Sequence, residues 1–179
     1  MKKICYQESK IVPISLFRID DRLVHGQVVQ GWLKAVSVDI LLVASDVAAQ
    51  DKIQQMVMGM AVPSDVKLKV KSLKDAVNIL SRIDNKTSVM VLVASPREAF
   101  YILEQGIKFN SLNIGGMHFF DGKKQILSNV CADNTDIKFL YKIYQRGIDL
   151  EPRILPNDER LNIIPLIEKE YLALSEVGK

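Results

Sequence analysis

A charged segment near the N-terminus holds the residues of this chain that are most suited to chemistry. Five of the eight residues from Arg18 to His25 are ionisable, and His25 is one of only two histidines in the chain. A connection between two elements needs only a few polar or turn-forming residues. We therefore interpret residues 18–27 as a functional loop between a strand and a helix, and we expect His25 to carry the chemistry.

The neighbours of His25 favour an anion at this place. A free imidazole titrates near ~6.5, so at neutral pH it can act as base, ligand or nucleophile. Arg18 and Arg22 supply guanidinium groups whose forked geometry fits phosphoryl oxygens. The helix that begins at Gly26 and Gln27 directs backbone N–H groups toward the loop, and Gly26 permits close approach. This combination favours an imidazole that carries a phosphoryl group. The simpler alternative is a histidine that only hydrogen-bonds its neighbours.

Further candidates complete the predicted site. Asp20 or Asp21 can hold one ring nitrogen of the histidine and leave the other as the nucleophile. Polar or small residues on other predicted loops are additional candidates: Asp46, Ser95, Gly115, Gly116 and His118. A helix-capping role explains Ser95 and Asp46 equally well, and a structural or surface role explains His118 equally well.

Alternating strands and helices must position these residues. Apolar runs of strand length predict parallel strands buried on both faces, and capped amphipathic segments predict helices. The expected strands are 14–17, 39–44, 66–70, 89–94, 111–114 and 150–155. The expected helices are 26–36, 48–60, 72–83, 96–106, 135–146 and 165–175. An Asp-Gly turn signal predicts a hairpin or excursion over 118–127.

This alternation predicts an α/β fold with a mostly parallel sheet and helices on both faces. We expect one domain over residues 1–179, with residues 1–12 as a lead-in. Ligands of such folds bind at the carboxyl ends of the strands, near a switch in strand order. Four loops should meet at that edge: 18–25, 45–46, 95–96 and 115–116.

The composition excludes several other classes. A net charge of +3, with basic residues scattered among acids, gives no reason to expect nucleic acid. No apolar stretch approaches the ~20 residues of a membrane span, and no apolar block follows the first lysines as in a secretory signal. Cys5 and Cys131 lie far apart and are expected to be free thiols in a reducing cytoplasm.

Recognised catalytic and cofactor motifs are also missing. With His118 as the only possible histidine partner of His25, the chain offers too few ligands for a metal site. The sequence contains no G-x-S-x-G elbow, no P-loop, and no G-x-G-x-x-G after the first strand. We therefore expect no metal and no cofactor.

Two sequence blocks resemble a known family. Residues 18–28 (RIDDRLVHGQV), and residues 113–119 (NIGGMHF) followed by 122–126 (GKKQI), are similar to signatures of one class of transport component. This is the IIB subunit of the mannose/fructose/sorbose class of the phosphoenolpyruvate-dependent sugar phosphotransferase system. The resemblance covers about residues 12–175 and implies an open, twisted sheet of about seven mostly parallel strands. The lead-in is its chief departure, since this family usually begins almost at the first strand.

The resemblance implies a protein-histidine sugar phosphotransferase. His25 would take a phosphoryl group, through Nδ1, from a IIA protein or domain. It would then pass the group to a sugar that the membrane IIC and IID subunits translocate. Arg18, Asp20 and Arg22 would orient His25 and neutralise the phosphoryl oxygens. The supporting residues would be Asp21, Gly26, Gln27, Ser95, Gly115 and Gly116.

The same resemblance implies a cytoplasmic protein associated with the membrane through IIC and IID. It does not choose among sugars, because specificity is expected to lie mainly in the membrane subunits, and it leaves a homodimer open. Since two partners must reach the histidine, we expect a shallow site on an exposed turn. The main alternative is an anion-binding regulatory module of the same fold that is never phosphorylated. A weaker one is a hydrolase that uses His25 as a base.

Overall fold

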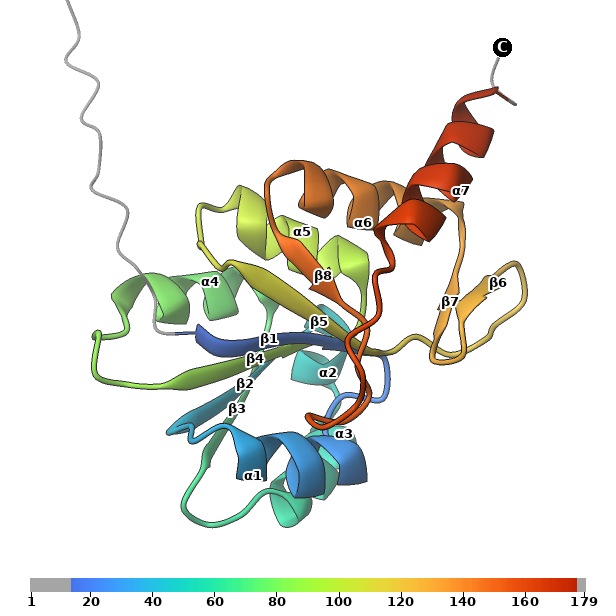
Figure 1. The fold of residues 1–179 in the computed structure, drawn as a ribbon. Helices are drawn as coiled ribbons and strands as arrows, with labels where there is room; N and C mark the ends of the chain where they lie inside the picture. The colour runs from blue at the N-terminus through green and yellow to red at the C-terminus, as the bar shows by residue number, and fades with distance from the viewer. Residues whose placement is uncertain (1–13, 177–179) are drawn as a thin grey trace, which may run out of the picture.

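A parallel sheet of six strands forms the centre of the computed structural model, which describes residues 14–176 (Figure 1). The strand order is β3-β2-β4-β1-β5-β8, and every pairing within this sheet is parallel. The strands are β1 (Ile14–Asp20), β2 (Ile40–Ala44), β3 (Lys67–Lys71), β4 (Val89–Val93), β5 (Ser111–Gly116) and β8 (Asp149–Glu151). The predicted α/β fold is thereby confirmed, with six strands in the sheet and two more in a separate hairpin. The expected lead-in and Cys5 lie outside the described residues.

Helices cover both faces of the sheet. One layer contains the π-helix η1 (Gln27–Trp32), α1 (Leu33–Ala35), α2 (Asp46–Gln50) and α3 (Lys52–Ala61). The other contains α4 (Leu73–Arg82), α5 (Pro96–Glu104), α6 (Asn134–Gln145) and α7 (Ile164–Glu176). In Figure 1 the second layer lies above the sheet, and α1 and α3 lie below it. Within the described part of the chain, no helix is both long and apolar enough to cross a membrane.

The burial of the strands follows their sequences. The uninterrupted apolar runs of β2 (ILLVA) and β4 (VMVLV) are buried at every position, as expected of central strands with helices on both faces. β3 (KLKVK) lies at an edge of the sheet and alternates lysine with Leu68 and Val70, which pack against the core. The continuous apolar runs therefore lie inside the sheet, and the alternating run lies at its edge.

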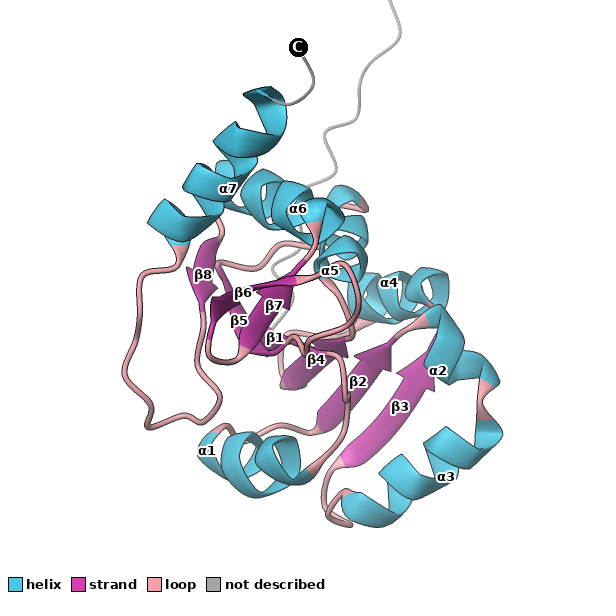
Figure 2. Ribbon diagram, turned by 90° about the vertical axis from the view of Figure 1, so that its right-hand side faces the viewer, coloured by secondary structure: helices cyan, strands magenta, loops and turns pink. Residues whose placement is uncertain are grey.

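The hairpin differs from its predicted position. β6 (Lys124–Leu127) pairs antiparallel with β7 (Val130–Ala132), so residues 128–129 form the turn (Figure 2). The Asp-Gly signal lies before β6, where Gly122 takes the left-handed φ of +89°. The hairpin is joined to the end of β5, because Met117 N–H donates to the Asn129 carbonyl and the Met117 carbonyl accepts from Cys131 N–H. The Asp-Gly turn therefore shapes the approach to the hairpin rather than its tip.

The helix predicted over 48–60 is interrupted, and its apolar stripe faces solvent. Asp51 divides it into α2 and α3, and its carboxylate caps α3 by accepting the N–H groups of Ile53 and Gln54. Only Met58 of α3 is buried. Four large apolar side chains of α3 are 61–83% exposed: Ile53, Met56, Val57 and Met60. An apolar stripe at helical spacing usually marks the face toward the core, which is not the case here.

Candidate functional site

The site forms where neighbouring strands send their connections to opposite faces of the sheet. β1 lies between β4 and β5. The segment after β1 enters the layer of η1, whereas the segment after β4 enters the layer of α5. The connections therefore diverge at the carboxyl ends of β1 and β4, which is the usual position of a ligand site in such folds. The charged segment 18–27 begins at this switch.

A strained residue turns the chain toward the helix. Leu23 has a φ of +56°, and it is the one non-glycine residue with a positive φ in the described part of the chain. Its N–H donates to the Asp20 carbonyl at 2.9 Å, and its side chain is buried in the core. Burial of the leucine side chain compensates the strain of the left-handed backbone. The Leu23 carbonyl then lies against the His25 ring.

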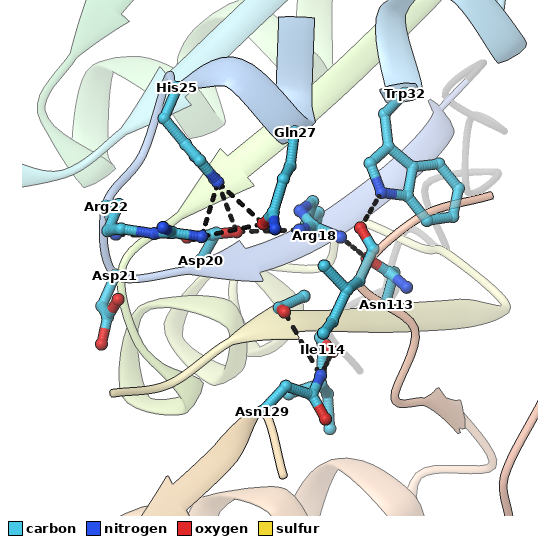
Figure 3. A network of polar contacts seen from close by, with 12 residues as sticks. Arg18, Asp20, Asp21, Arg22, His25, Gln27, Trp32, Asn113, Ile114 and Asn129 are labelled. Carbon is cyan, nitrogen blue, oxygen red and sulfur yellow. Dashed lines mark hydrogen bonds and ion pairs between the residues drawn. The ribbon is translucent and has the colours of Figure 1, made fainter. Parts of the chain in front are cut away.

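The contacts of His25 define the state of its ring (Figure 3). Nδ1 lies 2.9 Å from the Leu23 carbonyl, which can only accept a hydrogen bond. Nε2 lies 2.8 Å from a terminal nitrogen of Arg22, which can only donate. These two contacts together require the tautomer with the proton on Nδ1 and the lone pair on Nε2. Gln27 Oε1, at 3.1 Å, and Asp20 Oδ2, at 3.7 Å, also lie near Nε2.

Arg22 is the cation that can meet an incoming anion at this ring. One terminal nitrogen lies 2.8 Å from both His25 Nε2 and Gln27 Oε1. The Arg22 side chain is 45% exposed, whereas the His25 side chain is only 17% exposed. The site is therefore shallow, as expected, but the ring itself is more covered than an exposed turn would leave it.

Arg18 lies inside the protein, contrary to its expected position on the loop. It belongs to β1, and both it and Asp20 are 0% exposed. Its guanidinium donates to Asp20 at 2.8 Å, to the side-chain oxygen of Asn113 and to the Arg153 carbonyl. Burial lowers the pKa of Arg18, and the Asp20 carboxylate opposes this effect. In this geometry Arg18 does not reach phosphoryl oxygens; it fixes Asp20, which lies beside His25.

The sequence reasoning missed Trp32 and Arg153, which complete the support behind Arg18. Two guanidinium groups lie near the Trp32 ring, with the central carbons of Arg18 and Arg153 each 5.5 Å from its centre. Its Nε1–H donates to the Ile154 carbonyl at 2.8 Å. At this distance each guanidinium group gains cation–π attraction to the indole. A lone tryptophan on the stripe of η1 was the available signal, but nothing local pointed to Arg153.

The two glycines of β5 make room for this support. A side chain at Gly115 would begin 1.7 Å from the Arg18 guanidinium carbon, and one at Gly116 would begin 3.2 Å from Asp20 Oδ1. Gly115 and Gly116 therefore affect the site by leaving room for the side chains of Arg18 and Asp20. Gly26 differs, because it has an ordinary helical φ of −52° and nothing within 4 Å of where a side chain would begin. No close approach at Gly26 is present in this structure.

The remaining candidates have other partners. Asp21 accepts hydrogen bonds from the His118 backbone and from Nδ1 of its ring, at 2.6 and 2.5 Å, and points away from His25 (Figure 3). Ser95 caps α5 by accepting Glu98 N–H, and Asp46 accepts Leu73 N–H. No described contact links either residue to His25. Ser95 therefore caps its own helix, one of the two roles expected for it, whereas Asp46 holds the first N–H of α4 and makes no cap hydrogen bond in α2.

A cavity of about 480 Å³ opens beside the site. It lies between the charged loop, the end of β5 and the hairpin. Its lining includes Arg22, Gln27, Gly115, Gly116, Met117, His118, Phe119, Gln125, Ser128, Asn129, Cys131 and Ile154. Nowhere in residues 14–176 do three or more histidine, cysteine or acidic side chains gather as a metal site would require.

Comparison with known proteins gives a consistent result. The family described as "PTS system sorbose subfamily IIB component" matches residues 14–177. The PTS system mannose-specific EIIAB component of Escherichia coli K12 is 35% identical over 157 residues, which are 87% of this chain and 49% of that protein. This chain thus spans about half the length of that relative.

Two further similarities cover nearly complete relatives. One is the N-acetylgalactosamine-specific phosphotransferase enzyme IIB component 1 of Escherichia coli K12. It is 34% identical over an alignment that covers 84% of this chain and 96% of that protein. The crystal structure of the IIBSor domain of the sorbose permease from Klebsiella pneumoniae superposes with a TM-score of 0.81 at 31% identity. That superposition covers 87% of this chain and 96% of the domain.

Proposed function

This chain belongs to the family of PTS system sorbose subfamily IIB components, and from that premise we propose that it carries a phosphoryl group on His25. As a IIB component it is a sugar-specific phosphocarrier of the mannose/sorbose class. We further propose that a IIA protein or domain donates the phosphoryl group, and that a sugar bound by membrane IIC and IID subunits accepts it. The chain would then work at the cytoplasmic side of the membrane.

One observation carries the proposal. The His25 ring and the half-exposed Arg22 guanidinium lie 2.8 Å apart at the carboxyl edge of β1. A nucleophilic imidazole thus has a fixed positive charge at the place where phosphoryl oxygens would arrive. Arg22 can turn from Nε2 to those oxygens because its side chain is not enclosed. Asp20, held by Arg18, fixes the base of the loop by accepting Arg22 N–H at 3.2 Å.

Each transfer is a substitution at phosphorus. In the first, the bond from phosphorus to the donor's histidine breaks while a ring nitrogen of His25 forms the new bond. In the second, a sugar hydroxyl oxygen attacks phosphorus, the bond to His25 breaks and its electron pair stays on the ring nitrogen. The hydroxyl proton passes to solvent, and the ring returns to its neutral state. Contacts that stabilise the phosphorylated state and the transition state equally would not accelerate donation. Donation therefore does not require a site that encloses the phosphoryl group.

The identity of the phosphorylated nitrogen is a separate question. The resting contacts leave the lone pair on Nε2, whereas the family resemblance implies Nδ1. Phosphorylation on Nδ1 requires that this nitrogen leave the Leu23 carbonyl, for example by a half-turn of the ring. Long-range proton–nitrogen correlations of the ¹⁵N-labelled phosphorylated chain distinguish the two positions.

Phosphoryl transfer from labelled phosphoenolpyruvate, through the general proteins and a competent IIA protein, tests the proposal. We expect an acid-labile label on the wild-type chain and none on His25→Ala. His118→Ala is the matched control, because it removes the other histidine, which Asp21 holds, and should retain the label. An unlabelled wild-type chain beside a phosphorylated IIA would contradict the carrier function and favour an anion-binding module.

A further inference from the structure

The cavity beside His25 connects the phosphoryl-bearing loop to the β6–β7 hairpin. Arg22 and Gln27 form its wall on the loop side, and both contact His25 Nε2, at 2.8 and 3.1 Å. Gln125 and Asn129 belong to the hairpin side of the same cavity. A molecule in this cavity would touch the hairpin while one end lay against Arg22 and Gln27, which both contact His25. The cavity is therefore placed for the acceptor of the phosphoryl group.

The lining matches a molecule with many hydroxyl groups. Gln27, Gln125 and Ser128 contribute neutral amide and hydroxyl groups, which can both donate and accept hydrogen bonds. Hydroxyl groups of a sugar also do both. Asn129 contributes its side-chain oxygen, because its side-chain nitrogen donates to two carbonyls of the chain. An apolar ligand would remove these polar groups from water without replacing their hydrogen bonds, which is unfavourable. The volume of about 480 Å³ lies within the usual range of small-molecule sites.

Phe119 adds an aromatic ring to a lining that combines polar side chains with the apolar Met117 and Ile154. It is 65% exposed and lies three residues after the buried end of β5. A flat aromatic ring at the wall of a cavity with mixed polar and apolar lining suits a sugar, whose C–H face is apolar while its rim is polar. The combination of one exposed aromatic ring with several amide groups distinguishes this cavity from a site for a bare anion.

The hairpin side is fixed before any ligand arrives. The side-chain nitrogen of Asn129 donates to the carbonyls of Ile114 and Gly115, both at 3.2 Å (Figure 3). Its backbone carbonyl accepts Met117 N–H at 3.0 Å. Asn129 is thus locked to β5, which lowers the entropy lost when a ligand binds.

Resting on the proposed function, we propose that this cavity binds the sugar that accepts the phosphoryl group. The chain would then contribute to sugar recognition itself, in addition to the membrane subunits. Arg22 would lie at the phosphoryl end, the hairpin amides at the sugar's hydroxyl groups and Phe119 against its ring.

Titration of the ¹⁵N-labelled full chain with reaction products tests this proposal. The probes are mannose 6-phosphate, fructose 1-phosphate and N-acetylgalactosamine 6-phosphate, with inorganic phosphate as the reference. We expect at least one sugar phosphate to bind roughly tenfold or more tightly than phosphate, and to shift the side-chain amide signals of Gln125 and Asn129. Phe119→Ala should reduce that gain about fivefold or more. Met60→Ala, which removes an apolar side chain that is even more exposed and lies on α3, should not change it.

Other outcomes overturn the proposal. Equal binding of phosphate and all three sugar phosphates, or shifts confined to the charged loop, would show that the cavity does not recognise sugar. Signals of Gln125 and Asn129 that respond only to a partner protein would assign the cavity to a polypeptide. Phosphorylation of His25 is measured on the same wild-type sample. A labelled chain without sugar preference would contradict the cavity assignment alone, whereas an unlabelled chain would contradict the proposed function.

Discussion

Arg22 and Arg18 are four residues apart in sequence and perform different tasks. The Arg22 side chain is 45% exposed and contacts His25, whereas the Arg18 side chain is 0% exposed and contacts Asp20. An exposed arginine can be replaced without leaving a buried charge unpaired, but a buried one cannot. Substitution of Arg22 should therefore affect activity, and any change that displaces Arg18 should affect stability.

Arg22→Lys tests the first of these tasks. Lysine keeps the positive charge but lacks the fork that can hold His25, Gln27 and phosphoryl oxygens together. Loss of one charge-assisted hydrogen bond of about 1.5–3 kcal/mol predicts phosphoryl transfer slower by roughly 10- to 100-fold. The measurement is the rate of label transfer to the chain, with thermal unfolding to verify an unchanged fold. Wild-type kinetics in Arg22→Lys would remove Arg22 from the mechanism.

Gly115→Ala tests the support behind the site. The added methyl group would lie 1.7 Å from the Arg18 guanidinium carbon, so the guanidinium must move away from Asp20. An unpaired buried charge destabilises a protein by about 3–5 kcal/mol, and we expect a loss of that order in the free energy of unfolding, measured in urea. Gly59→Ala on α3 has nothing within 4 Å and should be neutral or slightly stabilising. Equal stability of the two variants would contradict the packing of Arg18 on Gly115.

At this scale the sequence pointed to the proposed reactive group but not to the residues that support it. The charge density of residues 18–25 was sufficient to single out His25 and Arg22. The burial of Arg18 was not predictable, because its partners Asn113 and Arg153 lie 95 and 135 residues further along the chain. A buried arginine depends on such distant partners, and local charge says nothing about them.

Among the elements, α5 contains a carboxyl group whose titration affects folding. Glu98 lies in the first turn of α5, and its carboxylate accepts Ala94 N–H at 2.6 Å. This hydrogen bond links the start of α5 to the residue that follows β4. Burial raises the pKa of Glu98 above its ordinary value, while hydrogen bonds from Ala94, Ser45 and Ser95 oppose the rise. The folded state therefore holds this proton more tightly than the unfolded state does.

Glu98→Gln removes this titration and keeps an oxygen to accept Ala94 N–H. The raised pKa stabilises the fold below the unfolded pKa of Glu98, and this contribution is lost as the pH rises through the folded pKa. As the pH rises through the folded pKa of Glu98, we expect the free energy of unfolding of the wild type to fall relative to that of Glu98→Gln. Urea unfolding of both proteins at a series of pH values gives the difference, in which other titrating groups cancel. A difference independent of pH would contradict the raised pKa.

The elements themselves were largely predictable, and their exceptions have physical causes. Local caps such as Ser72, Ser95 and Asp133 mark helix starts that the structure confirms. The apolar stripe of α3 gave no guide to burial. The spacing of apolar residues shows which of them share a face of a helix, but not whether that face points toward the core. The hairpin was displaced because an Asp-Gly pair signals a turn without saying which strands it joins.

For the whole molecule, the open sheet leaves two edges, and β3 is one of them. Its lysines, Lys67, Lys69 and Lys71, lie on one side of the strand. Like charges at an edge oppose pairing with a second copy, which is a common protection of edge strands. A homodimer, if formed, should therefore use another surface.

Replacing these three lysines with threonine tests the protection. Threonine favours strands and carries no charge, so we expect the triple variant to self-associate at concentrations where the wild type does not. Sedimentation velocity measures the change, with a triple arginine variant as the charge-retaining control. If the threonine and arginine variants sedimented alike, the lysines would have no protective role.

The overall architecture followed from the alternation of strands and helices, whereas the strand order did not. Each apolar run is compatible with several positions in the sheet, and the order is decided by how all the helices pack together. The switch beside β1 was therefore expected as a feature of such folds, but its position came from the structure.

The tryptophan beside two guanidinium groups gives the chain an optical signal of its own. Trp32 is the single tryptophan of the sequence, is 3% exposed and lies near Arg18, which holds Asp20 beside His25. Its fluorescence is therefore free of contributions from other indoles in this chain, and its buried position should give emission at short wavelength. If the phosphoryl group disturbs Asp20 and Arg18, the emission will change with it. Stopped-flow fluorescence would then follow the arrival and departure of the phosphoryl group in real time, without any attached dye.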